Sequence, residues 1–330
     1  MISQEPRGVG RLGAVAAWVS AVCCLPYLVL KVLWTVGMPV GVTDRSVLDS
    51  GEWVAGNAVM AVVQLVGLLL VLALTRRWAR RVPVWLLLLP VWVGTGLLFQ
   101  VAVGAVLAGL FRVPSQASGA NTEGIQPWVF VMVYSAFAGQ GVALAIAFAC
   151  HVRARWGRML GKRTDEAMAS RAPRAPSRVE RHLGIMAKAV AGMAVGVALV
   201  FCYWAAGGSF GLSGVAPLPS RAMQASRVVG AVTAVVGLLG LTGRWGRRTR
   251  FWRPAALIWL GSGALATFDG LTVVLNRLFL VFGTDASQPG WALLDTALVI
   301  KVVIGVLAAV VGALAVATAA KDAGSPLGPG

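Results

Sequence analysis

Apolar segments long enough to cross a membrane recur along the whole chain, and short clusters of arginine separate them. Several of these segments exceed the roughly 18 residues that indicate a bilayer-spanning helix. Hydrophobic residues make up 58% of the 330 positions and charged residues only 12%, which leaves too little polar surface for a water-soluble protein of this length. The sequence therefore predicts an all-α, polytopic membrane protein.

Eight transmembrane helices are predicted, over residues 12–36, 53–75, 82–111, 127–150, 183–206, 227–242, 254–280 and 291–320. The loops alternate in charge: 21 lysines and arginines fall on one side, and four fall on the other, namely Arg45, Arg112, Arg221 and Arg227. Positive residues are retained on the cytoplasmic face. We therefore expect a multi-pass protein of the cell inner (plasma) membrane with both termini in the cytoplasm.

Two stretches of the chain, 167 residues apart, are closely similar. Residues 74–96 read LTRRWARRVPVWLLLLPVWVGTG, and residues 241–263 read LTGRWGRRTRFWRPAALIWLGSG. A match of this kind indicates an internal repeat. It divides the protein into two parallel-topology repeats of four helices, residues 1–150 and 183–330, and the second repeat ends in a short disordered tail. Because four helices return the chain to the same face, we expect an axis along the membrane normal.

The segment between the repeats, residues 151–182, is rich in Arg, Ala, Pro and Ser and has no apolar periodicity. It is predicted to be a basic cytoplasmic linker held near anionic lipid headgroups by its charge. The net charge of +17 comes from such clusters between spans. Topology explains them, so no nucleic-acid partner is expected.

Asp269 lies near the middle of the seventh predicted span, where an ionisable group is costly and usually faces the bundle interior. Asn276 follows at i+7 on the same face, and Arg277 lies about 80° round the helix. Two interpretations stay open. Asp269 is either part of a structural ion pair or hydrogen bond that joins helices, or a titrating acid in a cavity.

Other charged residues extend this set. Asp295 lies about one turn inside the eighth span, and Lys301 follows six residues later on a different face. Lys301 must therefore pair with another helix or extend toward the outer surface. Glu52 adds a carboxylate at the start of the second span.

Polar and aromatic side chains are concentrated in the predicted outer half of the membrane. Tyr27, Lys31 and Trp34 share one face of the first span, just after the helix-kinking Pro26. The second span carries a regular stripe of polar groups. We expect these residues to line one aromatic cavity that binds substrate, together with Trp53, Asn57, Tyr134, Tyr203, Trp204 and Asn276.

Several motifs are missing from the sequence. It has no Walker loop, no His/Cys/Asp cluster with metal-ligand spacing and no aspartate-rich D-D-x-x-D pair. Both histidines, His151 and His182, are predicted at cytoplasmic helix ends, away from the acids, which excludes a Ser/His/Asp hydrolase. We expect no metal, no cofactor and four free cysteines.

The fifth span ends in FCYWAAGGSFGL, residues 201–212. This resembles the Tyr-Trp-Ala-x-Gly-Gly signature of an uncharacterised bacterial family of small four-helix membrane proteins. The resemblance covers roughly the second half of the chain, and LKVLWTVGMPVG at residues 30–41 is a degenerate counterpart in the first half. It implies a tandem four-helix architecture and no particular activity.

Three functions remain open from the sequence. The first is a metal-independent membrane enzyme that cyclises a lipophilic prenylated substrate in terpenoid biosynthesis, similar in kind to bacterial membrane-bound terpene cyclases. Asp269 would be its proton donor, with Glu52 and Asp295 as further catalytic carboxylates and aromatic faces stabilising the carbocation. The second is a proton-coupled small-molecule transporter, and the third is a non-catalytic membrane subunit.

Overall fold

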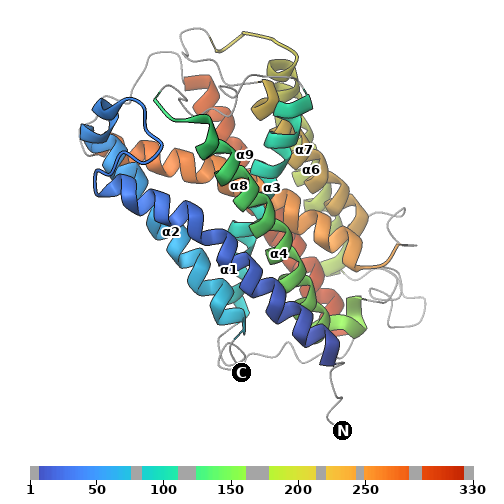
Figure 1. Cartoon of the computed structure of the whole chain (residues 1–330). Coiled ribbons are helices and arrows are strands. Elements are labelled where there is room, and N and C mark those ends of the chain that lie inside the picture. Colours follow the sequence, from blue (N-terminus) through green and yellow to red (C-terminus); the bar gives the residue numbers. More distant parts are fainter. Residues whose placement is uncertain are drawn as a thin grey trace.

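The computed structural model describes residues 7–75, 84–110, 124–160, 178–212, 221–242, 249–281 and 292–322. Eight α-helices make up nearly all of this part of the chain, and they alternate in direction along the bundle (Figure 1). A short 3₁₀ turn, η1 (Arg45–Asp49), precedes the second helix. The helices are α1 (Arg7–Thr35), α2 (Gly51–Thr75), α3 (Val84–Leu110), α4 (Pro127–Leu160), α6 (Arg178–Ala205), α7 (Arg221–Thr242), α8 (Trp252–Val281) and α9 (Ala292–Asp322).

Seven of these helices are long and apolar enough to cross a membrane. The exception is α2, whose described apolar segment is the shorter stretch Trp53–Leu69. The weakest predicted span, residues 227–242, is one of the seven, and its helix begins earlier, at Arg221. The prediction of an all-α, multi-pass membrane protein is therefore confirmed.

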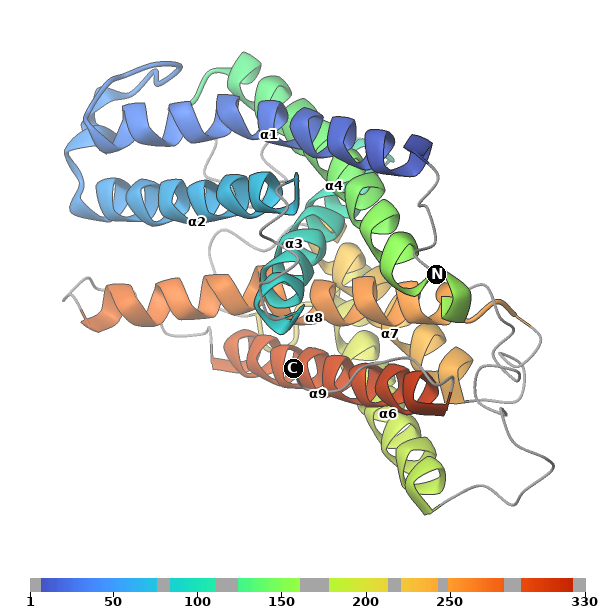
Figure 2. The ribbon, with the colours of Figure 1, turned by 90° about the horizontal axis from the view of Figure 1, so that it is seen from below.

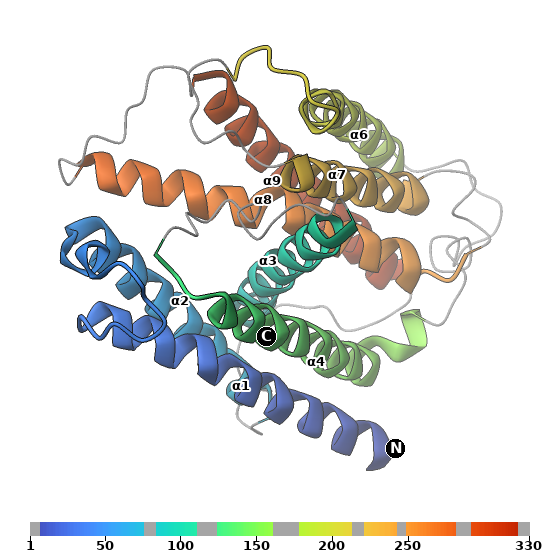
Figure 3. The same ribbon diagram turned by 45° about the horizontal axis from the view of Figure 1, so that its top comes forward.

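The second half of the chain forms the more compact bundle. Helix α7 packs against α6 and α8, and α9 packs against α8 and α6 (Figure 2). In the first half, α1 packs along α2 and α4, whereas α3 packs mainly on α8 and α7 and less on its sequence neighbours α4 and α2 (Figure 3). Helix α3 therefore connects the two halves.

The crossing of α3 and α8 is built from the two W-x-G-x-G segments. Gly96 lies so close to Gly263 that a Cβ atom added at Gly96 would lie 2.5 Å from the Gly263 carbonyl carbon. Small residues allow helices in membranes to approach in this way. The segments repeated in the sequence are thus in direct contact with each other.

The turns that follow α1 and α6 share one hydrogen-bond pattern. Trp34 donates its indole N–H to the carbonyl of Val40 at 2.8 Å, and Trp204 donates its indole N–H to the carbonyl of Phe210 at 3.0 Å. The third residue after each tryptophan is a glycine with positive φ, 79° in the first turn and 104° in the second. Glycine adopts this conformation at little cost. The segment at residues 201–212 and its degenerate counterpart at residues 30–41 therefore fold alike.

The linker predicted at residues 151–182 is helical at both ends. Helix α4 continues to Leu160 and α6 already begins at Arg178, while residues 161–177 lie outside the described part. These helical ends extend into the segment predicted as a linker, and the basic cytoplasmic linker over 151–182 stays a prediction. The tail at residues 323–330 also lies outside the described part.

Candidate functional site

Three charged side chains from three helices meet in the core of the second half. Arg227 on α7 binds Asp269 on α8 through two hydrogen bonds, Nε to Oδ2 at 3.1 Å and Nη2 to Oδ1 at 2.8 Å. Lys301 on α9 donates Nζ to Oδ2 of the same carboxylate at 2.5 Å. We call these three residues the ion cluster.

Lys301 and Arg227 make further hydrogen bonds outside the ion cluster. Lys301 Nζ donates to the carbonyl oxygens of Ala264 and Leu265 on α8, at 3.2 and 3.1 Å, so its three hydrogens are all used. Arg227 donates Nη1 to Gln224 Oε1 at 2.6 Å, and its guanidinium lies 5.3 Å from the centre of the Phe201 ring. The geometry of the cluster is therefore tightly constrained.

The charges of the ion cluster do not balance. Arg227 is 6% exposed, Asp269 1% and Lys301 0%, so all three are buried. One carboxylate faces two cations, which gives the cluster a net charge of +1 when both cations are protonated. Buried charge is stable only when it is paired and hydrogen-bonded, and here one positive charge lacks a carboxylate in the cluster.

Sequence reasoning found part of this cluster. Lys301 was expected either to pair with another helix or to extend toward the outer surface, and it pairs with Asp269 on α8. Asp269 was left open between ion pairing and titration, and the structure places it in an ion pair. The assignment of Arg227 to an outer loop was wrong, because α7 begins at Arg221 and carries Arg227 six residues inside the helix. Extending that helix back through RAMQASR would have revealed it.

A second cluster lies in the first half, where α1 meets α2. Lys31 donates Nζ to Asn57 Oδ1 at 2.7 Å and lies 5.1 Å from the centre of the Tyr27 ring and 4.8 Å from that of Trp34. The rings of Trp34 and Trp53 are 5.3 Å apart. We call these five residues the lysine cluster. All five were predicted to bind substrate, and the structure brings them together.

The other predicted aromatic site residues lie on α4 and α6. Tyr134 lies on α4 three residues before Phe137, whose ring is 4.7 Å from that of Tyr27. Trp204 is buried at the end of α6 against Phe201, 5.5 Å between ring centres, and Tyr203 is exposed beside it. The described contacts of these groups thus fall in the two halves of the chain, and the single aromatic cavity stays a prediction.

The predicted carboxylates are also separate. Asp295 lies half-buried in the first turn of α9, about 9 Å along the helix axis from Lys301 at 1.5 Å per residue. The side chains of Glu52, Asn276 and Arg277 lie outside the described part of the structure. Asp269 is thus the one predicted catalytic carboxylate with described contacts to other charged groups.

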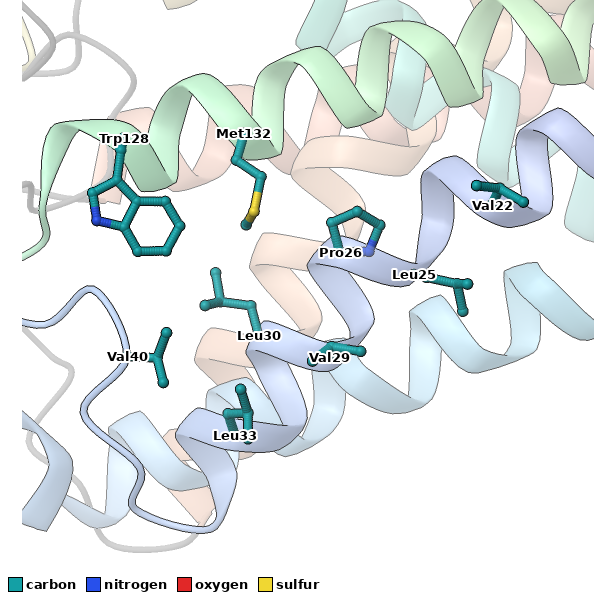
Figure 4. Close-up of a pocket in the computed structure, with 9 residues that line it drawn as sticks. All are labelled: Val22, Leu25, Pro26, Val29, Leu30, Leu33, Val40, Trp128 and Met132. Carbon is teal, nitrogen blue, oxygen red and sulfur yellow. The ribbon is translucent and has the colours of Figure 1, made fainter.

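A groove of about 470 Å³ lies between α1 and the start of α4 (Figure 4). Its lining is apolar, and none of the predicted site residues belongs to it. The groove is on the side of α1 opposite Lys31, as their separation along the helix requires. It is lined by Val22, Leu25, Pro26, Val29, Leu30, Leu33, Val40, Trp128 and Met132.

Comparisons with protein-family models, with curated proteins and with solved structures find no match to this chain. The resemblances to the four-helix family and to terpene cyclases therefore stay predictions. What the two clusters do has to be inferred from their own residues.

Proposed function

We propose that the protein is a proton-coupled membrane transporter of a small lipophilic molecule, and that Lys301 takes up and releases the proton. The observation that carries this proposal is a single buried carboxylate, Asp269, shared between the two cations Arg227 and Lys301. Ionisable groups inside transmembrane helices are rare, and they often belong to ion pathways and proton relays.

A purely structural role explains the ion cluster less well. One cation is enough to pair with Asp269, and Arg227 already does so through two hydrogen bonds. A buried ion pair contributes little to stability compared with apolar packing, and a second cation adds a further desolvation cost. Loss of one proton from Lys301 would leave a neutral cluster with the Arg227–Asp269 pair intact. The cluster thus has two charge states that differ by one proton.

The contacts of Asp269 favour transport over cyclisation. A proton donor to a lipophilic substrate has to be a protonated acid that faces the substrate. Asp269 instead accepts three hydrogen bonds from two cations and is 1% exposed. These contacts favour the ionised carboxylate. Terpenoid cyclisation with Asp269 as the acid stays a prediction that this arrangement does not support.

The internal repeat suggests how movement of one half of the chain is coupled to protonation of the ion cluster in the other half. We interpret the chain as two four-helix repeats, related by an axis along the membrane normal, that move against each other. The matched turns after α1 and α6 and the crossing of α3 with α8 support this interpretation. Gln100 on α3 donates to Ser226 Oγ at 2.7 Å, directly beside Arg227. Movement of α3 would therefore reach the ion cluster.

The proposed orientation follows from charge. The arginine-rich segments at residues 76–81 and 244–253 are placed in the cytoplasm, against the anionic headgroups of the plasma membrane, together with both termini. Protons would then enter the cluster from the outer side, where the α8–α9 connection lies in this topology.

Transport can be tested with the purified protein in proteoliposomes. A pH gradient is imposed, and uptake of a panel of lipophilic cations, neutral compounds and anions is followed. We expect gradient-driven uptake of at least one class, which collapses when a protonophore dissipates the gradient. Uptake that is equal in protein-free vesicles, or that persists with the protonophore, would exclude proton-coupled transport of these compounds.

A further inference from the structure

The lysine cluster offers hydrogen-bond donors and a positive charge. The described partner of the Lys31 ammonium is a neutral amide, Asn57 Oδ1, which accepts one of its three hydrogens. The Asn57 amide is itself fixed, because its Nδ2 donates to the carbonyl of Trp53 at 2.8 Å. Among the side chains that the structure describes, no carboxylate is paired with Lys31.

A second donor belongs to the same lysine cluster. Trp53 Nε1 is buried and has no hydrogen-bond partner in the described structure. A buried donor without an acceptor loses the hydrogen bond that water would give it, which is unfavourable. The ring of Trp53 lies against Trp34, and the Lys31 ammonium lies over the same Trp34 ring. The Lys31 ammonium and the Trp53 ring are therefore both in contact with Trp34.

We infer that the lysine cluster binds the oxyanion of a lipid-soluble molecule, a carboxylate or a phosphate. Such a group has at least two acceptor oxygens, so one can accept from Lys31 Nζ and another from Trp53 Nε1. Trp34 does not compete for the ligand, because its own Nε1 donates to the carbonyl of Val40. Charge-assisted hydrogen bonds of this kind are the strong ones.

The position of the cluster identifies the kind of molecule. Lys31 lies one turn before the end of α1, and Trp53 lies in the first turn of α2. These positions are at the end of two apolar helices, which is the depth of a lipid headgroup. The oxyanion thus belongs to an amphiphile whose tail lies in the bilayer. Its source is either a free carboxylate amphiphile or the phosphate of a membrane lipid.

This inference goes beyond proton-coupled transport. The lysine cluster is in the first half of the chain and the ion cluster in the second, and binding is measured without a pH gradient. A protein that binds amphiphiles but does not move them would contradict only the proposed transport. A protein that transports but shows no Lys31-dependent binding would contradict only this inference.

The test uses the full chain in detergent and native mass spectrometry with three probes: oleate, its uncharged methyl ester and phosphatidylglycerol. We expect saturable binding of oleate or of phosphatidylglycerol, and weaker binding of methyl oleate. Binding of oleate identifies a carboxylate ligand, and binding of phosphatidylglycerol alone identifies a lipid phosphate. Lys31→Met should weaken this binding by about tenfold or more, the loss of one charge-assisted hydrogen bond, and Lys31→Arg should retain most of it.

Two further variants keep the test decisive. Lys188→Met removes the same charge from an exposed position on α6 and should leave binding unchanged. Trp53→Phe keeps Lys31 and an aromatic ring against Trp34, removes the free N–H together with part of the indole, and should weaken binding by about threefold to tenfold. The inference is overturned if methyl oleate binds as well as oleate. It is also overturned if Trp53→Phe and Lys31→Met bind like Lys188→Met.

Discussion

Trp92 on α3 and Trp259 on α8 make reciprocal hydrogen bonds across the crossing of their helices. Trp92 Nε1 donates to Ser262 Oγ at 3.0 Å, and Trp259 Nε1 donates to Thr95 Oγ1 at 2.9 Å. Both donors and both acceptors are 167 positions apart in the sequence. When residue i contacts j and the equivalent of j contacts that of i, the interface has the form expected for a twofold axis. The repeated segments therefore pack as an interface between the halves.

Trp92 and Trp259 should contribute equally to the free energy of unfolding. Trp92→Phe and Trp259→Phe each remove one indole donor from the crossing, so each should lower the free energy of unfolding by about 1 kcal/mol. The measurement is unfolding by SDS in mixed micelles. Trp18→Phe, at an exposed position of α1, is the control and should have a smaller effect. A loss in only one of the two variants would contradict a reciprocal interface.

The glycine contact at the same crossing gives a steric prediction. Gly96→Ala places a methyl group within 2.7 Å of three Gly263 backbone atoms, so α3 and α8 have to separate. We expect a loss of about 1–3 kcal/mol in the free energy of unfolding, as for other overpacked positions. Gly67→Ala in α2 meets no described atom within 4 Å and should be neutral or stabilising. Equal stability of the two variants would exclude a close crossing at Gly96.

The ion cluster predicts a ranking of variants. Asp269→Asn leaves two buried cations without a carboxylate, and we expect a loss of about 3–5 kcal/mol. Lys301→Met leaves the neutral Arg227–Asp269 pair and should cost less. Adding Lys301→Met to Asp269→Asn should recover part of the loss. These values are read from unfolding curves, and the ranking is contradicted if Lys301→Met alone is as destabilising as Asp269→Asn.

Asp44, in the loop after α1, gives a pH prediction outside the membrane. The hydroxyl of Ser46 donates to Asp44 Oδ1 at 2.7 Å and its backbone N–H at 3.0 Å, and these hydrogen bonds lower the pKa of Asp44 below the ordinary value. Because the pKa of Asp44 is lower in the folded protein than in the unfolded chain, the ionised carboxylate stabilises the fold fully above the ordinary aspartate pKa. This stabilisation is lost as the pH falls through the lowered pKa of the folded protein. A titration followed by the NMR shift of the Asp44 carboxyl carbon should show the lowered pKa. Ser46→Ala should raise the pKa of Asp44 toward the ordinary value.

Much of the fold could be predicted from the sequence, because hydropathy and helical periodicity act locally. The helices of the described chain lie close to the predicted spans, and the lysine cluster follows from i, i+4 and i+7 spacing on α1 with a polar stripe on α2. The cost of a lone buried charge also limited Lys301 to two alternatives, a partner on another helix or extension toward the outer surface. These inferences need no knowledge of how the helices are arranged.

The ion cluster as a whole could not be predicted, for two physical reasons. Periodicity shows which face of a helix is polar but not which helix lies opposite, so the meeting of α7, α8 and α9 at Asp269 was hidden. Hydropathy also places helix ends poorly where polar residues point inward. Arg227 was therefore taken for a loop residue, although α7 buries it six residues from its start.

The most direct test of the account compares proton-coupled uptake by wild-type protein, Lys301→Met and the exposed control Lys188→Met. The substrate is whichever compound the wild-type protein moves in proteoliposomes under a pH gradient. We expect Lys188→Met to behave like wild type and Lys301→Met to lose gradient-driven uptake while it remains folded, because the Arg227–Asp269 pair is retained. Unchanged gradient-driven uptake by folded Lys301→Met would contradict the claim that Lys301 carries the proton.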